Sequence, residues 1–121
     1  HRHAVFELEG RRVNDEAIKI LSRVVLGRCL ELDVRYPSPR LMVALYLSVV
    51  DGLTPTEVAR TMGISPKTAD NQLQGIRTRL EYAGVREMTR DLERRYFRLE
   101  ARLGVEQEMK GLLTEMAGAV A

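Results

Sequence analysis

The sequence has no tryptophan, only two phenylalanines and four tyrosines, and a single cysteine. Few aromatic residues favour helices packed through aliphatic side chains over a β-sandwich. One cysteine, Cys29, excludes an internal disulfide framework and a cysteine-based zinc site, so a reducing cytoplasm is expected. No stretch approaches the roughly 18 apolar residues that cross a bilayer, and no signal peptide is recognisable. We therefore predict an all-α protein of the cytoplasm without a membrane partner.

Residue patterns that carry catalysis are also missing. The two histidines, His1 and His3, lie at the N-terminal end and are interpreted as part of an arm. No glycine-rich phosphate loop, carboxylate pair or metal-ligand spacing is present. Cys29 falls on an apolar helical stripe, which is typical of a buried small hydrophobic residue. The sequence therefore predicts no enzyme, no metal and no cofactor.

The charge is small in total but unevenly distributed. The formal net charge is +2, and arginine is far more frequent than lysine. Basic and acidic residues balance over residues 1–59, whereas basic residues are in excess over 60–98 and acidic ones over 99–121. The excess over 60–98 is either a solvated helix face or a surface for phosphate groups.

Helical periodicity and capping signals divide the chain into several helices. Val5, Phe6 and Leu8 are compatible with a short strand or an arm. A helix is expected from Asn14 or Asp15, which can cap it, to Asp33. After the connector 35–39, Ser38-Pro39 opens a second helix that stops at Asp51-Gly52.

The middle of the chain has the pattern of a helix-turn-helix. Thr54-Pro55-Thr56-Glu57 is a capping box that opens a short third helix. Gly63 permits the positive φ of a tight turn, and Ser65-Pro66 opens a fourth helix, expected over 66–82 with Gly84 closing it. Two short helices joined in this way present the second one to the major groove of DNA.

The fourth helix has an apolar side and a polar side. Ala69, Leu73, Ile76 and Leu80 are expected to face the core, which turns the polar residues outward. Asn71 and Gln74 can each pair with adenine, and Asp70 can accept from cytosine. Lys67, Arg77 and Arg79 are predicted to contact phosphates, which positions the helix without reading sequence.

The turn and the fourth helix begin with the run Gly63-Ile64-Ser65-Pro66-Lys67-Thr68-Ala69-Asp70-Asn71-Gln72-Leu73-Gln74, and Gly52 to Ala59 precede it. Together these residues resemble the LuxR/GerE-type helix-turn-helix of bacterial transcription regulators. The likeness covers roughly residues 38–90. It implies a four-helical domain that binds two DNA half-sites as a dimer. It also implies base contacts at Asp70, Asn71 and Gln74 and phosphate contacts at Lys67, Thr68 and Arg79.

The C-terminal third is predicted to form two amphipathic helices separated at Gly104. Apolar residues recur at helical spacing on both sides of this glycine. Such a stripe serves either as intramolecular core or as a homodimer contact. Its methionines, Met88, Met109 and Met116, could also receive a different protein.

Three regions follow from these patterns: an N-terminal arm and helix (1–37), a helix-turn-helix core (38–84) and C-terminal helices for dimerisation (85–121). The predicted function is sequence-specific binding of double-stranded DNA by a bacterial, nucleoid-associated regulator. Two alternatives remain open. One is a helix-turn-helix module that docks on RNA polymerase or another regulator, because region four of the sigma factors has a related scaffold. The other is a phage DNA-packaging small subunit.

Overall fold

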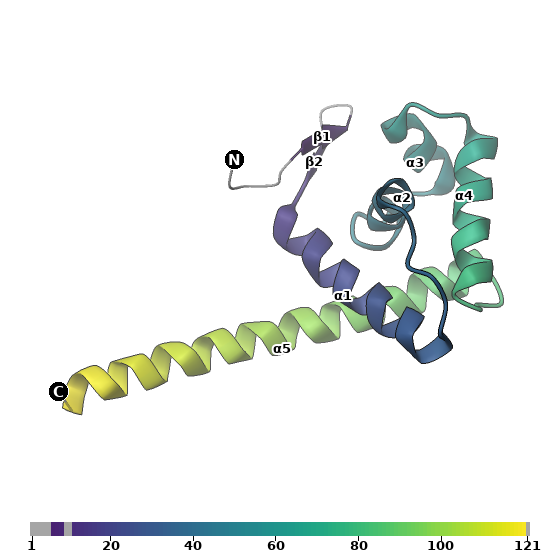
Figure 1. Cartoon of the computed structure of the whole chain (residues 1–121). Helices are drawn as coiled ribbons and strands as arrows, with labels where there is room; N and C mark the ends of the chain where they lie inside the picture. Colours follow the sequence, from purple (N-terminus) through teal and green to yellow (C-terminus); the bar gives the residue numbers. More distant parts are fainter. Residues whose placement is uncertain (1–5, 9–10, 121) are drawn as a thin grey trace.

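The protein is a small helical body from which one long helix projects (Figure 1). The computed structural model describes residues 6–8 and 11–120. The helices described are α1 (Asp15–Leu32), α2 (Pro39–Val49), α3 (Pro55–Met62), α4 (Pro66–Arg79) and α5 (Val85–Val120). The predicted all-α class with a helix-turn-helix core is confirmed. Among these helices, none combines the length and apolar composition needed to cross a bilayer.

A short hairpin precedes α1. Strand β1 (Phe6–Leu8) pairs antiparallel with β2 (Arg11–Val13), with Phe6 opposite Val13. Of the two possibilities for the segment around Phe6, a short strand or an arm, the structure has the strand. Val5, His1 and His3 lie outside the described residues.

Polar caps define where the first four helices begin. The side chains of Asn14, Ser38, Thr54 and Ser65 each accept a hydrogen bond from a backbone N–H of the first turn. Thr54 also forms the predicted capping box, since Glu57 Oε1 accepts from the Thr54 N–H at 2.9 Å. These bonds satisfy backbone donors that a helix start leaves unpaired, so each start is specified locally.

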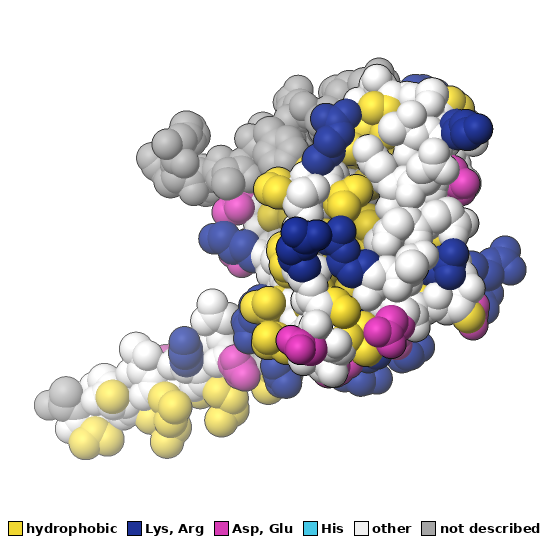
Figure 2. Space-filling view, turned by 45° about the vertical axis from the view of Figure 1, so that its right-hand side comes forward, with side chains coloured by type: hydrophobic (Ala, Val, Ile, Leu, Met, Phe, Trp, Pro, Cys, Tyr) yellow, Lys and Arg dark blue, Asp and Glu magenta, His cyan; other side chains and the backbone are white. Residues whose placement is uncertain are grey.

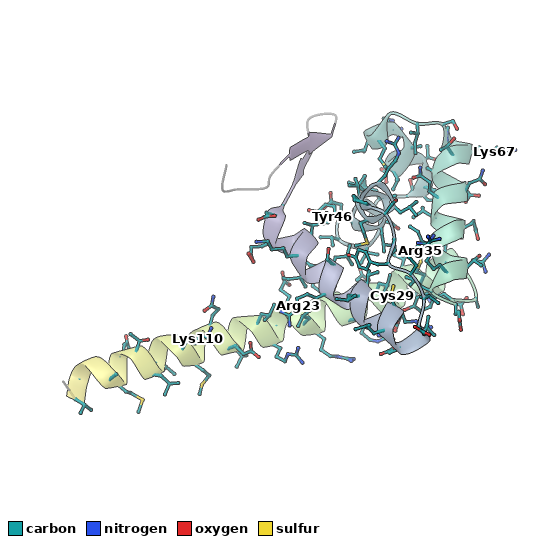
Figure 3. All side chains as sticks on the ribbon, in the orientation of Figure 1. Arg23, Cys29, Arg35, Tyr46, Lys67 and Lys110 are labelled. Atoms are coloured by element: carbon teal, nitrogen blue, oxygen red, sulfur yellow. The ribbon has the colours of Figure 1, made fainter. Side chains whose placement is uncertain are left out.

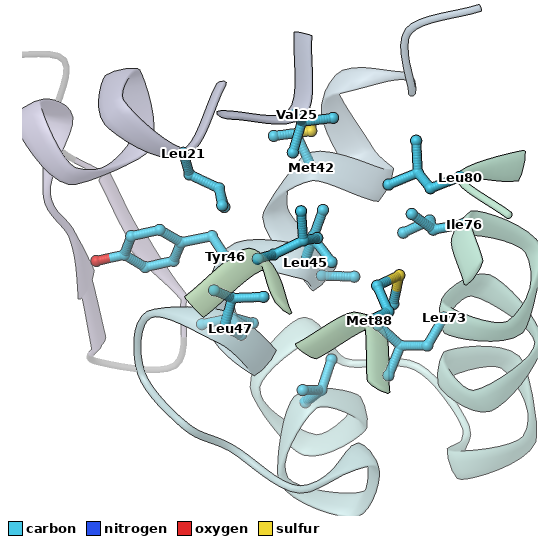
Figure 4. Close-up of a cluster of buried hydrophobic side chains, with 14 of the residues drawn as sticks. Leu21, Val25, Met42, Leu45, Tyr46, Leu47, Leu73, Ile76, Leu80 and Met88 are labelled. Atoms are coloured by element: carbon cyan, nitrogen blue, oxygen red, sulfur yellow. The ribbon is translucent and has the colours of Figure 1, made fainter. Parts of the chain in front are cut away.

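The core lies where α2 is surrounded by the other helices (Figure 4). Leu45 and Leu47 of α2 are fully buried, and α1 contributes Leu21 and Val25. Leu73 and other α4 residues join from one side, and Met88 and Leu92 of α5 join as well. This packing holds α4 against the body along one side only.

The end of α4 differs from the prediction. The helix stops at Arg79 rather than near residue 82, and the residue with a left-handed conformation after it is Glu81 (φ 61°), whereas Gly84 was expected to close the helix. Leu80 is completely buried, and Tyr82 N–H donates back to the Arg77 carbonyl at 3.0 Å. The chain therefore turns here to bury Leu80, and Gly84 instead precedes α5.

The C-terminal region also differs from the prediction, because it is one helix rather than two. α5 runs without a break through Gly104, although residues 104–120 are all exposed. A glycine costs a helix about 1 kcal/mol relative to alanine, which weakens the helix without breaking it. Gly104 was therefore wrongly interpreted as a helix end.

The turn between α3 and α4 depends on Gly63. Its φ is positive, as predicted, at +70°. Its N–H donates to the carbonyls of Ala59 and Arg60 near the end of α3. A side chain is strained in this conformation, so we expect Gly63→Ala to lower the free energy of unfolding by about 1–2 kcal/mol. Urea denaturation followed by circular dichroism measures this change.

Gly75→Ala is the matched control, because Gly75 lies inside α4 with open space around its Cα. This variant should gain up to about 1 kcal/mol through helix propensity. A Gly63→Ala protein as stable as the wild type would contradict the assigned role of the turn.

Candidate nucleic-acid interface

Helices α3 and α4 are joined by the three-residue turn Gly63–Ser65. Ile64 N–H donates to the Ala59 carbonyl at 3.0 Å, and the Ile64 side chain packs against the core. Ser65 Oγ accepts from Thr68 N–H at 3.1 Å and so fixes the first turn of α4. Ala59 is buried to 1% exposure, and so small a side chain lets the two helices cross closely. The turn is therefore held at both ends.

Helix α4 is buried on the side that the sequence predicted. Ala69, Leu73 and Ile76 are at most 1% exposed, and Leu80 just beyond the helix is completely buried. The opposite side, here called the outer face of α4, carries Lys67, Thr68, Asp70, Asn71 and Gln74. All of these are exposed except Gln74, which is half-buried. The structure therefore brings the three predicted base-contacting residues together on one accessible face.

Asn71 lies near the middle of this outer face. It is almost opposite Leu73 and Ala69 around the helix, at 100° per residue. Within the described part of the chain, the side-chain amide of Asn71 makes no hydrogen bond. Both its carbonyl oxygen and its NH2 group are thus available to a ligand, as paired recognition of adenine requires.

Gln74 is engaged within the protein. Its Oε1 accepts a hydrogen bond from Arg77 Nε at 3.0 Å, while Arg77 Nη1 donates to the Tyr82 carbonyl at 3.4 Å. Gln74 can pair with adenine through both amide groups only if Arg77 releases its oxygen. This bond between two residues one turn apart was not predicted from the sequence.

The two C-terminal arginines of α4 are half-buried rather than fully outward. Arg79 Nη1 donates to the Tyr36 carbonyl at 3.4 Å, which ties α4 to the connector before α2. Arg77 is held as described above. Each guanidinium group has five N–H donors, so each retains donors for a phosphate. Lys67, in contrast, is exposed and projects from the outer end of α4 (Figure 3).

Cationic side chains surround the polar surface of α4. Figure 2 shows mainly backbone and uncharged side chains over this part of the molecule, with Lys and Arg groups at intervals around it and a few Asp and Glu groups among them. Arg40 and Arg60 are exposed on the neighbouring helices α2 and α3, and Arg35 is exposed on the connector. Such an arrangement suits a polyanion whose backbone meets the rim while its bases meet the centre.

A cluster that the sequence analysis missed supports the C-terminal end of α4. Arg28 of α1 donates from Nε to the Leu80 carbonyl at 3.1 Å, and its guanidinium lies 4.7 Å from the centre of the Tyr82 ring. The Tyr82 hydroxyl donates to Asp91 of α5, and Arg95 Nε lies 2.9 Å from Asp91 Oδ2. The cluster joins α1, α5 and the end of α4.

The ionisation of this cluster follows from its surroundings. Burial, together with the bond to Asp91, raises the pKa of Tyr82 to about 12, so the phenol remains a donor at neutral pH. Burial alone would raise the pKa of Asp91, but the Tyr82 hydrogen bond and the charges of Arg95 and Arg94 outweigh it and lower that pKa. Asp91 is therefore an anion that the cluster stabilises.

Metal-ligating side chains are not gathered together in the part of the chain that the structure describes. No group of three or more His, Cys, Asp or Glu side chains among them could hold a metal ion. Cys29 is 2% exposed, and burial raises the pKa of its thiol despite the opposing charge of Arg79. The prediction that Cys29 is buried is confirmed.

Helix α3, its turn and α4 together define a helix-turn-helix of the DNA-binding type. Residues 38–80, from the cap of α2 to Leu80, match the family model described as Sigma-70, region 4. This domain type binds DNA and is not catalytic. The match covers less than half of the chain and supports a helix-turn-helix regulator without singling out the LuxR/GerE type. Comparison with curated proteins and with solved structures gave no significant match.

Proposed function

We propose that this chain is a sequence-specific transcription regulator of the LuxR/GerE kind that reads the major groove with α4. The observation that carries the proposal is the outer face of α4, where Asn71 stands unengaged at the centre of an exposed polar surface. Asp70 and Gln74 flank it as further base contacts, and Lys67, Thr68, Arg77 and Arg79 contact the phosphates. The protein acts as a homodimer on double-stranded DNA in the bacterial cytoplasm.

Replacing Asn71 by alanine tests base reading directly. On a duplex selected from a random pool, we expect Asn71→Ala to weaken binding by about 5- to 150-fold, equivalent to about 1–3 kcal/mol. On random duplex the loss should be much smaller, because phosphate contacts dominate there. Fluorescence anisotropy with both duplexes gives the two affinities.

Gln107→Ala is the matched control, since it removes an amide from an exposed position of α5 far from α4. It should leave both affinities unchanged. Equal losses for Asn71→Ala on selected and random duplex would contradict base reading by this residue.

The match to sigma-70 region 4 favours a second candidate, docking on RNA polymerase. Salt dependence separates the two. A direct DNA binder should lose affinity for random duplex steeply between 50 and 200 mM salt, about 10³-fold or more for six phosphate contacts. A docking module should instead bind purified bacterial RNA polymerase and show little affinity for DNA at either salt concentration.

A further inference from the structure

The projecting part of α5 carries an apolar stripe that the body of the protein does not cover. Val105, Met109, Leu112, Leu113, Met116 and Val120, here called the pairing face, are each more than half exposed. Figure 2 shows apolar side chains in a row along one side of this part of the helix. A contiguous exposed row of large apolar side chains marks an interaction surface.

This pairing face does not continue the stripe with which α5 packs into the body. Met88, Leu92 and Tyr96 are buried in the core, and Leu99 packs partly against it. At 100° per residue, the centre of the pairing face is rotated by roughly 110° from that stripe. Helix α1 therefore does not obstruct the pairing face, and a partner can lie along it.

The helix itself also requires a partner here. Residues 104–120 are all exposed and include Gly104, Gly111 and Gly118. Glycine lowers helix propensity, and short isolated helices are marginal in water. Association along the pairing face would supply the packing that this segment lacks.

We infer that the partner is a second copy of this chain, paired in parallel along residues 105–120. Val105, Met109, Leu112 and Met116 follow one another at spacings of four, three and four, as the a and d positions of a two-stranded coiled coil do. Met109 and Met116 take the a positions, and Val105 and Leu112 take the d positions. This inference rests on the dimeric form in the proposed function.

The acidic residues beside the pairing face select the parallel orientation. Glu108 and Glu115 occupy g positions, and antiparallel pairing over this segment would set Glu108 opposite Glu115 of the second copy. In a parallel pair, g positions face e positions, where Leu113 and Val120 lie. The parallel arrangement thus avoids a like-charge contact and adds apolar contact with the glutamate stems.

Arginines set the N-terminal limit of the pairing. Arg94, Arg98 and Arg102 lie about five full turns before Leu112, Met116 and Val120, and therefore on the same side of α5. In a parallel pair these arginines of the two copies would face each other and repel. The two α5 helices therefore separate on the N-terminal side of Val105, which leaves room for the two helical bodies.

Cross-linking of the full chain tests the inference without DNA, so its outcome is independent of the proposed DNA binding. Val105→Cys should form a disulfide-linked dimer under mild oxidation, because d positions meet their own copies in a parallel pair. Thr114→Cys, on the outer side of α5, should not. A dimer by light scattering that fails to cross-link through Val105→Cys would overturn the parallel arrangement.

Sedimentation equilibrium tests the pairing itself. Leu112→Glu should raise the dimer dissociation constant by roughly 100-fold or more, since a charge would be buried at the centre of the pairing face. Thr114→Glu, the matched control, should change it by less than about 2-fold. A wild-type chain that is monomeric at tens of micromolar would overturn the inference.

Discussion

Leu73→Ala is expected to lower the free energy of unfolding by about 2–5 kcal/mol. Leu73 is 1% exposed and packs into the core from the middle of α4, so its removal leaves a cavity between α4 and the body. The same side chain fixes which side of α4 faces outward. Guanidinium denaturation followed by circular dichroism at 222 nm measures the loss.

Leu30→Ala provides the control, because Leu30 is 72% exposed on α1 and the chemical change is the same. It should alter stability by no more than about 0.5 kcal/mol. If the two variants were equally stable, the assignment of Leu73 to the core would be wrong, and with it the outward direction of Asn71.

Asp91→Asn is expected to cost about 2–3 kcal/mol at pH 7, because charged hydrogen bonds to Tyr82, Arg94 and Arg95 are lost or weakened. The pKa of Asp91 is lowered from its ordinary value of 3.8 in the folded protein. The stabilisation is therefore fully present above pH 3.8 and disappears as the pH falls through the folded value. Chemical denaturation from pH 7 to pH 2.5 follows both effects.

The difference between wild type and Asp91→Asn should accordingly shrink below about pH 4, where the wild-type carboxylate becomes protonated. Glu93→Gln, an exposed position on the same helix, should show no such behaviour. A stability difference that stays constant down to pH 2.5 would show that the Asp91 charge is not what stabilises the cluster.

The sequence predicted those features that depend on neighbouring residues. The caps at Ser38, Thr54 and Ser65 were identified, and Asn14 was one of the two residues expected to cap the first helix, because a cap needs only a short polar side chain and the next turn of helix. The buried side of α4 was also identified from its periodicity. These signals lie within a few residues of the structure that they specify.

Features that depend on distant contacts were not predictable in the same way. α4 ends at Arg79 because Leu80 enters the core and Tyr82 meets Arg28 and Asp91, which come from two other helices. No pattern of neighbouring residues predicts such a cluster. The helix end predicted at Gly104 was wrong although glycine is a local signal. A glycine that ends one helix can lie inside another when the neighbouring residues favour continuation.

The candidate site shows the same division. The exposure of Lys67, Asp70 and Asn71 follows from helical geometry, and the sequence was sufficient to place them. The bonds that hold Arg77 to Gln74 and Arg79 to the Tyr36 carbonyl were not anticipated. Their contacts with bases and phosphates remain predictions, which the DNA-binding measurements address.

The unbroken course of α5 has a mechanical consequence for the proposed dimer. Its 36 residues form a rod about 54 Å long at 1.5 Å per residue, and the same rod contacts Tyr82 through Asp91 near one end. A rod of this kind transmits orientation, whereas a flexible tether would transmit only proximity. Two α4 helices attached to such rods would have a fixed orientation relative to each other. Inserting a single base pair between the half-sites would then rotate one half-site away from the α4 helix that binds it.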